Sequence, residues 1–426
     1  MSLNRKAMAL AVGAALAAPA AYSQTSDKWE IYGKFYPELT HASGTGASSG
    51  ASSSTLGTAP AGTSAIISRW EMQVSNTYIG FRGQRDLGGG LKAIGQLEQS
   101  VSLDEGTTTG NTARVSPSFG NRDSFAGLET NWGTVRLGNM DTPFKKYGDT
   151  LGFLGVSSGN FVSPNNVMRR MGSGASSSGS SFNLRRANAI DLASPTLPGG
   201  VQVGVQYSIG NPDESGAATL NAPGSAGINP GANRFPRVVS LGVKWEQGPL
   251  YLAAAAETHF DMFGGSSSAG GAVSNAGLAT VNSKDTAVQL TAVYKIGVHS
   301  IEVDVNTKQY KENGATVTNS FEKYKNNAYE LVWEARWTNQ WRTALSYMKA
   351  TAGSCSVVNA GCTTDGLEGT QVNAGVSYFL DPSTYVFGLF SRLTNGTAAR
   401  FNNTASQTVN AGEDITQVAF GITYNF

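Results

Sequence analysis

The sequence predicts an all-β protein, a 16-stranded antiparallel transmembrane β-barrel built as one domain. Three observations predict it: apolar residues recur at alternate positions in short segments, these segments are even in number, and short connections alternate with long ones. The C-terminal stretch "QVAFGITYNF" shows the alternation, with Val418, Phe420, Ile422, Tyr424 and Phe426 separated by small or polar residues. Successive side chains of an extended chain point to opposite faces, so such a strand has one apolar face.

The first 23 residues are typical of a secretory signal peptide. Arg5 and Lys6 precede an apolar run, and small residues follow at Ala21 and Ser23, so we expect cleavage after Ser23. The run is short for a membrane-spanning helix, which makes an uncleaved anchor the weaker alternative. We therefore expect an exported protein whose barrel domain comprises residues 24–426.

The composition narrows the function classes. Without Arg5 and Lys6, the mature chain has 29 basic and 30 acidic residues, a formal charge of −1. This balance gives no argument for a nucleic-acid partner. No later stretch approaches the roughly 20 apolar residues of a membrane helix, whereas 52 glycines and a charged fraction of only 14% favour an exported β protein.

Alternating segments cover most of the mature chain, and their bounds carry an uncertainty of a few residues. In "HSIEVDVNTK", for example, Ile301, Val303 and Val305 alternate with Glu302 and Asp304. The sixteen segments are 28–40, 69–85, 90–102, 120–131, 133–141, 184–194, 200–210, 237–247, 249–260, 284–297, 298–311, 324–338, 340–351, 369–380, 383–395 and 414–426.

The connections predict how the barrel is oriented. Short ones such as "DLGGGL", "EQGPL" and "LDPST" alternate with long Gly- and Ser-rich ones such as 41–65, 142–183, 211–236 and 261–283. Short periplasmic turns and long extracellular loops are the layout of an outer-membrane barrel, whereas a soluble β-sandwich has no reason to sort its connections by length. Backbone groups in a membrane must all be paired, so the first and last strands are expected to be neighbours.

The same reasoning assigns the faces of the last strand. Phe420, Ile422 and Tyr424 are expected to face lipid, with Tyr424 and Phe426 in an interfacial aromatic girdle. Gly421, Thr423 and Asn425 are then expected to face an aqueous lumen, which a barrel of sixteen strands leaves open.

The only two cysteines, Cys355 and Cys362, lie close together in "SCSVVNAGCTT". In an oxidising compartment this spacing predicts a disulfide that closes one loop. Two thiols without a nearby histidine do not make a zinc site, and no cofactor or metal is expected.

Several motifs together resemble those of Gram-negative general diffusion porins, in particular the betaproteobacterial branch. They are "IYGK", "YIGFRGQRDLGGGLKAIGQLE", "NRDSFAGL", "GTVRLGN" and the terminal Phe426, and the resemblance extends over nearly the whole mature chain. It implies that the third extracellular loop, here about residues 142–183, folds into the barrel and forms an eyelet between a basic wall and acidic loop residues. It also implies a homotrimer, and a role for Phe426 as a signal to the barrel-assembly machinery.

The resemblance implies which residues form the basic wall. Lys34 matches a first-strand basic residue, and alternation also turns it toward the lumen. Arg122 matches a fourth-strand arginine, but counting back from Leu128 turns it outward, so a bulge is required. Arg185 or Arg186 matches a sixth-strand arginine, and counting back from the apolar residues of that strand favours Arg185.

The eyelet also departs from the family pattern. Tyr78 replaces a usual wall arginine, and the loop offers Asp149 and then Phe153 where two acids are common. Arg82 is expected to face the lumen below the eyelet, and the loop adds the cations Lys145, Lys146, Arg169 and Arg170. Several fixed cations and few loop acids predict a weak to moderate preference for anions.

Three other functions remain as alternatives. The closest is a substrate-specific channel for small organic anions, which saturable flux would distinguish from a general pore. An adhesion protein would use the long loops, and loop deletion followed by a cell-binding assay would test it. An enzyme is not favoured, because His41, His259 and His299 are scattered and no Ser, His and acid set is apparent. The predicted partners are therefore small hydrophilic solutes and ions, outer-membrane lipid and the barrel-assembly machinery.

Overall fold

A computed structural model of the chain describes residues 27–103, 120–148, 150–156, 159–174, 181–209, 211–212, 218–219, 235–275, 278 and 280–426. The predicted signal peptide, residues 1–23, lies outside the described residues.

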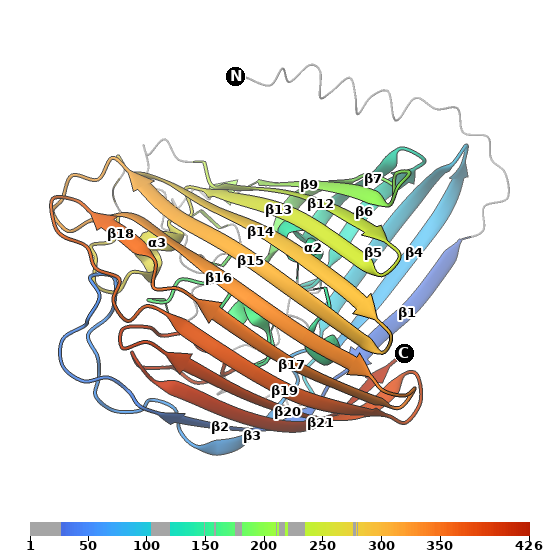
Figure 1. Cartoon of the computed structure of the whole chain (residues 1–426). Helices are drawn as coiled ribbons and strands as arrows, with labels where there is room; N and C mark the ends of the chain where they lie inside the picture. The colour runs from blue at the N-terminus through green and yellow to red at the C-terminus, as the bar shows by residue number, and fades with distance from the viewer. Residues whose placement is uncertain are drawn as a thin grey trace.

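The main sheet is a closed antiparallel barrel with sixteen wall strands, as predicted (Figure 1). Two of the wall strands are interrupted: the first consists of β1 and β2, and the second of β3 and β4. β18 is a short additional strand that pairs with β16. The strands of the sheet are β1 (Lys28–Phe35), β2 (Glu38–Thr45), β3 (Arg69–Gln73), β4 (Tyr78–Gly88), β5 (Leu91–Ser100), β6 (Ser124–Thr130), β7 (Gly133–Asp141), β8 (Arg185–Ala193), β9 (Val201–Ile209), β12 (Arg237–Gln247), β13 (Leu250–Phe260), β14 (Asn282–Ile296), β15 (His299–Asn313), β16 (Phe321–Arg336), β17 (Trp341–Ala350), β18 (Ser354–Val357), β19 (Gly369–Phe379), β20 (Thr384–Asn395) and β21 (Asp414–Asn425).

The remaining described elements are short and lie in the connections. They are a two-residue ladder of β10 (Asn211–Pro212) and β11 (Ala218–Thr219), the helices α2 (Pro143–Tyr147) and α3 (Gly264–Ser268), and the 3₁₀ turns η1 (Phe153–Gly155) and η2 (Pro164–Asn166). Among the described residues, no helix is long and apolar enough to cross a membrane.

The barrel closes between the first and last wall strands. Lys34 pairs with Asn425 in the β1–β21 ladder, and Gly33 and Phe426 exchange two backbone hydrogen bonds of 3.0 and 3.1 Å. Pro37 has no N–H to donate, which explains the break between β1 and β2, but its carbonyl accepts a bond from the backbone N–H of Ile422 at 3.2 Å. The ring of strands therefore has no free edge.

The two faces of the wall are sorted as the alternation predicts. In β21, Phe420 is 62% exposed and Tyr424 47%, while Thr423 is fully buried. In β15, Ile301, Val303 and Val305 are exposed, and Glu302, Asp304 and Asn306 are buried. The apolar side chains thus cover the outside, and the polar ones point inward.

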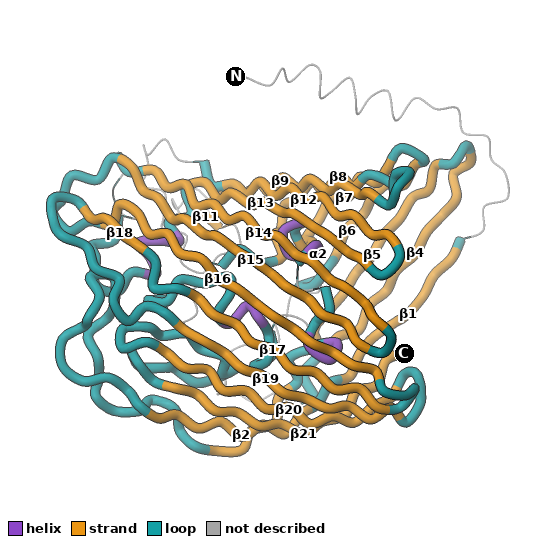
Figure 2. Tube along the Cα trace, in the orientation of Figure 1, coloured by secondary structure: helices purple, strands orange, loops and turns teal. Residues whose placement is uncertain are grey.

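The long connections gather at one end of the barrel, opposite the short turns and the C-terminus (Figure 2). The tip of the first loop reaches across to the connection after β18: the backbone N–H of Thr55 donates to Thr363 O at 3.0 Å, and the N–H of Thr363 donates to Thr55 Oγ1 at 2.9 Å. A disulfide joins Cys362 of that connection to Cys355 of β18. Leu56 is fully buried in an apolar cluster with Phe144 and Phe321, among other residues. The loops therefore cover part of the barrel opening at the long-loop end.

Glu413 fixes the other limb of the first loop. Its carboxylate accepts hydrogen bonds from the backbone N–H groups of Ala65 at 3.1 Å, Ile66 at 3.0 Å and Asn410 at 2.9 Å, and from the hydroxyl of Ser64. Burial alone would raise the pKa of Glu413, but these hydrogen bonds to the charged form outweigh it and hold the pKa below its usual value.

We predict that acid loosens this limb. A carboxyl group whose pKa is lower in the folded state stabilises the fold above its unfolded pKa of about 4.3, and this contribution is lost as the pH falls through the folded pKa. Hydrogen-exchange protection of the Ala65 and Ile66 amides should therefore fall about tenfold or more on acidification. In the Glu413→Gln protein, protection should be low at neutral pH already. Native protection that persists unchanged well below the folded pKa would contradict the assignment.

Candidate functional site

The connection between β7 and β8, residues 142–183, folds into the barrel. Thr142 caps α2 by accepting a hydrogen bond from the Lys145 N–H at 3.3 Å, and Pro143 fits the first helical turn. The helix rests on the inner faces of β9, β12 and β13. Gly242 makes this approach possible, because a Cβ there would lie 2.4 Å from Cδ2 of Tyr147.

The middle of this loop is fastened by inward side chains of the far wall. Glu302 of β15 accepts bonds from the backbone N–H groups of Thr150 and Leu151 at 2.8 and 2.6 Å. At η1, Arg342 of β17 donates to the carbonyl of Leu154 at 2.5 Å, and Lys34 of β1 donates to that of Gly155 at 3.1 Å. Lys34 and Arg342 therefore meet the loop at neighbouring residues.

The rest of the loop follows the wall and returns to β8. Asn160 donates to Glu38 at 2.8 Å, and the carbonyl of Phe161 accepts from Gln371 at 2.7 Å. On the way back, Arg169 donates to Gln289 at 2.8 Å. These contacts hold the loop against the β9, β12–β21 side, and the inward side chains of β1 and β4–β8 line the space that is left.

That space has a first charge cluster around Glu98 of β5. The Glu98 carboxylate forms an ion pair with Arg122 and accepts a bond from the Tyr32 hydroxyl at 3.0 Å. The Arg122 guanidinium also lies over the Tyr78 ring, 4.5 Å from its centroid. Tyr78 is directly paired with Lys34 in the β1–β4 ladder.

A second charge cluster joins the loop to β7 and β8. Arg185 contacts Asp123 at 2.6 Å and Asp141 at 3.2 Å, and Asp141 also pairs with Lys145 of α2 at 2.9 Å. Asp191 forms an ion pair with Arg136 and lies 3.4 Å from Lys146. Because α2 lies inside the barrel, these clusters line the interior.

The two clusters are positive on balance. The carboxylates stand on the wall beside the cations, whereas residues 142–183 contain a single acid, Asp149, which lies outside the described residues. Among the described residues, the two clusters hold five cations and four carboxylates: Arg122, Arg136, Lys145, Lys146 and Arg185 with Glu98, Asp123, Asp141 and Asp191. Lys34, the ladder partner of Tyr78, brings the number of cations to six.

The structure resolves how Arg122 turns inward. β6 begins at Ser124, not at residue 120 as the sequence predicts, so Arg122 lies in the bend before the strand and is free of the strand's alternation. No bulge inside β6 is needed. Arg82 also lies inside, in a two-point ion pair with Glu30 (2.7 and 2.9 Å), toward the short-turn end of β4.

Two predicted eyelet residues lie elsewhere. Arg186 is fully buried, 3.0 Å from Nε2 of His259 and 3.9 Å from Glu257. The β7–β8 ladder shifts register between Gly138 and Met140, and this shift turns Arg186 inward. Arg186 holds the returning limb of the loop and does not line the opening. Phe153 is only 2% exposed and packs in an apolar cluster between the loop and the wall.

The sequence analysis missed all four carboxylates of the clusters and two arginines, Arg136 and Arg342. Alternation would have found Arg136, which lies between the exposed Val135 and Leu137, and Glu98, which follows the exposed Leu97. No sequence signal identifies Asp123 and Asp141 as partners of Arg185, because their strands are joined only in the folded barrel.

These features define a class: a transmembrane β-barrel whose interior is narrowed by a folded loop. Residues 7–398 match the family described as Gram-negative porin, and the chain belongs to that family. The protein is therefore located in the outer membrane of a Gram-negative cell. Porins are passive channels, which agrees with the prediction that the protein is not an enzyme.

Curated relatives match a short part of the chain. The major outer membrane protein P.IB of Neisseria lactamica is 49% identical over 73 residues, 17% of this chain and 19% of the relative, and that of Neisseria gonorrhoeae is 49% identical over 70 residues, 16% of this chain and 18% of the relative. The matched part thus spans about a fifth of the length of these relatives.

Solved structures match the whole fold. An anion-selective porin from Comamonas acidovorans has a TM-score of 0.64 and 22% identity, covering 94% of this chain and 100% of that one. The trimer form of OmpT from Vibrio cholerae has a TM-score of 0.59 and 13% identity, covering 94% and 100%. At these identities the likeness concerns the fold alone.

We predict that Gly242→Ala displaces α2 from the wall. The added methyl group overlaps the Tyr147 ring, and such overpacking typically costs about 1–3 kcal/mol. The barrel should still fold, seen as an unchanged heat-dependent shift on gel electrophoresis, while cleavage by protease within residues 143–148 and the open-channel current noise both increase.

Gly388→Ala is the matched control, because a Cβ at Gly388 meets its nearest atoms at an ordinary 3.6 Å. It should behave as the native protein. Equal protease resistance in both variants would mean that the contact between α2 and β12 does not hold the loop.

Proposed function

We propose that the protein forms a water-filled channel for passive diffusion of small hydrophilic solutes and ions, with a weak to moderate preference for anions. The observation that carries this proposal is the excess of six cations over four carboxylates when Lys34 is counted with the two charge clusters. Fixed charge in a narrow aqueous passage concentrates ions of opposite sign.

The pairing of these charges supports a modest preference. Each of the four carboxylates lies within 4 Å of a cation, so most of the positive charge is compensated locally. Lys34 has no carboxylate within that distance among the described residues; it donates to a loop carbonyl instead. Lys34 is therefore the cation without a carboxylate partner, whereas Arg342, which meets the loop at the neighbouring residue, lies 3.8 Å from Glu334. One protein of similar structure is described as an anion-selective porin, which agrees with a net positive charge in the passage.

A channel specific for small organic anions is the second candidate. The stacked pair of Arg122 and Tyr78 offers both a cation and an aromatic face at the passage. Flux that saturates with concentration would favour this candidate, whereas flux linear in concentration would favour the general pore.

We further infer a homotrimer embedded in outer-membrane lipid. On the outer face, Gly83, Gly95 and Ala126 stand side by side across β4, β5 and β6, and such small residues allow another copy to pack closely. A trimer form exists among proteins of this fold. The expected signal peptide would direct export, and Phe426, at the closing seam, would be the residue that the barrel-assembly machinery recognises.

We predict that replacing Arg122 and Arg185 together by Ala abolishes most of the ion preference. The change leaves four cations beside four carboxylates, so the reversal potential in a potassium chloride gradient should move from the chloride-selective sign to near zero. The measurement uses the purified protein in a planar bilayer.

Arg392→Ala is the control, because Arg392 is an exposed arginine of β20 that pairs with Asp414 away from the passage. It should keep the native reversal potential. A native channel that is cation-selective would refute the charge assignment, and the absence of any conducting steps from folded protein would refute the channel itself.

A further inference from the structure

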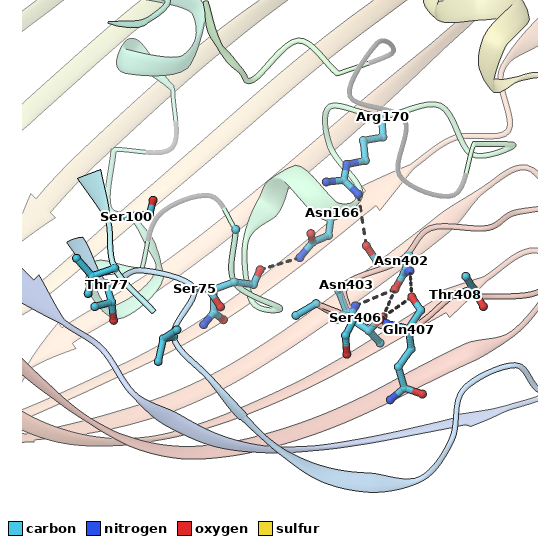
Figure 3. A pocket seen from close by; sticks show the side chains of 16 residues that line it. Ser75, Thr77, Ser100, Asn166, Arg170, Asn402, Asn403, Ser406, Gln407 and Thr408 are labelled. Atoms are coloured by element: carbon cyan, nitrogen blue, oxygen red, sulfur yellow. Dashed lines mark hydrogen bonds between the residues drawn. The ribbon is translucent and has the colours of Figure 1, made fainter. Parts of the chain in front are cut away.

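A second polar space lies at the long-loop end, above the charge clusters. It is a cavity of about 600 Å³ between the break of the second wall strand, the end of β5, the inward loop and the last loop (Figure 3). Its volume is in the range of small-molecule sites. Thr77 and Ser100 line it, and they adjoin Tyr78, over which Arg122 lies. A solute leaving this cavity therefore reaches the passage directly.

Among the residues that the structure describes, one charged residue lines the cavity, Arg170 of the inward loop. Its guanidinium donates to the backbone carbonyl of Asn402 at 3.5 Å, a long contact, and no carboxylate among the described residues lies within 4 Å of it. Burial disfavours the charge and lowers the pKa of Arg170. An anion in the cavity would compensate this charge, and a guanidinium binds a carboxylate with two parallel hydrogen bonds.

The rest of the lining is neutral and rich in hydroxyl and amide groups. Ser75, Asn166, Asn403, Ser406 and Thr408 line it from three separate segments. Ser75 Oγ and Asn403 Oδ1 are buried in the cavity wall, out of reach of a solute, whereas Ser406 and Thr408 are exposed. Hydroxyl and amide groups bind sugar hydroxyls well, whereas a purely apolar acid would leave them unpaired.

We propose that this cavity is a binding site for small polyhydroxylated carboxylates, the class of the sugar acids. Arg170 binds the carboxylate, and the hydroxyl and amide groups bind the chain of hydroxyls. The proposal rests on the channel function and adds a solute class: such a solute is held above the passage before it enters. A neutral polyol lacks the group that compensates Arg170, and a small carboxylate without hydroxyls lacks the other contacts.

Gluconate is the probe, added to the long-loop side of single native channels in a planar bilayer with potassium chloride on both sides. Gluconate should reduce the current saturably, while sorbitol and acetate at the same concentrations should reduce it much less. In Arg170→Gln, which keeps a polar side chain without the charge, the half-maximal gluconate concentration should rise about tenfold or more.

The matched control is Lys323→Gln, which removes an exposed cation of β16 that does not line the cavity. Its gluconate response should be that of the native protein. If native channels conduct but gluconate acts linearly, or equally in Arg170→Gln, the binding site is refuted and the channel stands. If gluconate and acetate act alike and both depend on Arg170, the hydroxyl contacts are refuted. Native protein that never conducts would refute the channel function.

Discussion

The pairing of backbone N–H and C=O groups in a medium without water is the constraint on which this structure depends. It requires the sheet to close, and the seam between β1, β2 and β21 shows how closely the chain meets it. Even Pro37, which interrupts the ladder, still offers its carbonyl to Ile422. With sixteen strands, the closed sheet encloses an interior too wide for side chains alone to fill. A separate segment must therefore narrow the interior, and residues 142–183 do so.

The narrowing loop is held by polar contacts with inward side chains at nearly every stage. Glu302, Arg342, Gln371 and Gln289 each belong to a different wall strand, and each binds a loop residue. The same alternation that gives the wall its lipid-facing surface supplies these inward groups. Glu302, Arg342 and Gln371 bind loop backbone groups that would otherwise be buried without partners, and Gln289 binds the side chain of Arg169. The fold of the wall and the position of the loop thus have one origin in the sequence.

Much of this fold could be predicted because a period of two is a local property. Ile301, Val303 and Val305 disclose the outward face of β15 without knowledge of any neighbouring strand. Part of the site was harder to predict, because Arg122, Arg185 and Arg186 lie at or just before the start of a strand, where the period of two is not a reliable guide. Arg122 faces inward because β6 begins late, and Arg186 turns inward after a register shift. Asp123 and Asp141 can be recognised as partners of Arg185 only when the order of the strands and their register are both known. Phe153, expected at the eyelet, packs in an apolar cluster, because a loop has no period from which the direction of a side chain could be predicted.

The position of the carboxylates on the wall has a consequence for how the passage sorts solutes by size and by charge. In the described clusters, Arg136 and Asp191 belong to the sheet, Arg122 lies in the bend before β6 beside Glu98 of β5, and only the two lysines of α2 come from the inward loop. A displacement of the loop would widen or narrow the opening, yet most of the charges would stay where the backbone ladder holds them. Lys145 and Lys146, however, equal the whole excess of six cations over four carboxylates, so a loop that left the wall would change the charge balance of the proposed passage together with its width.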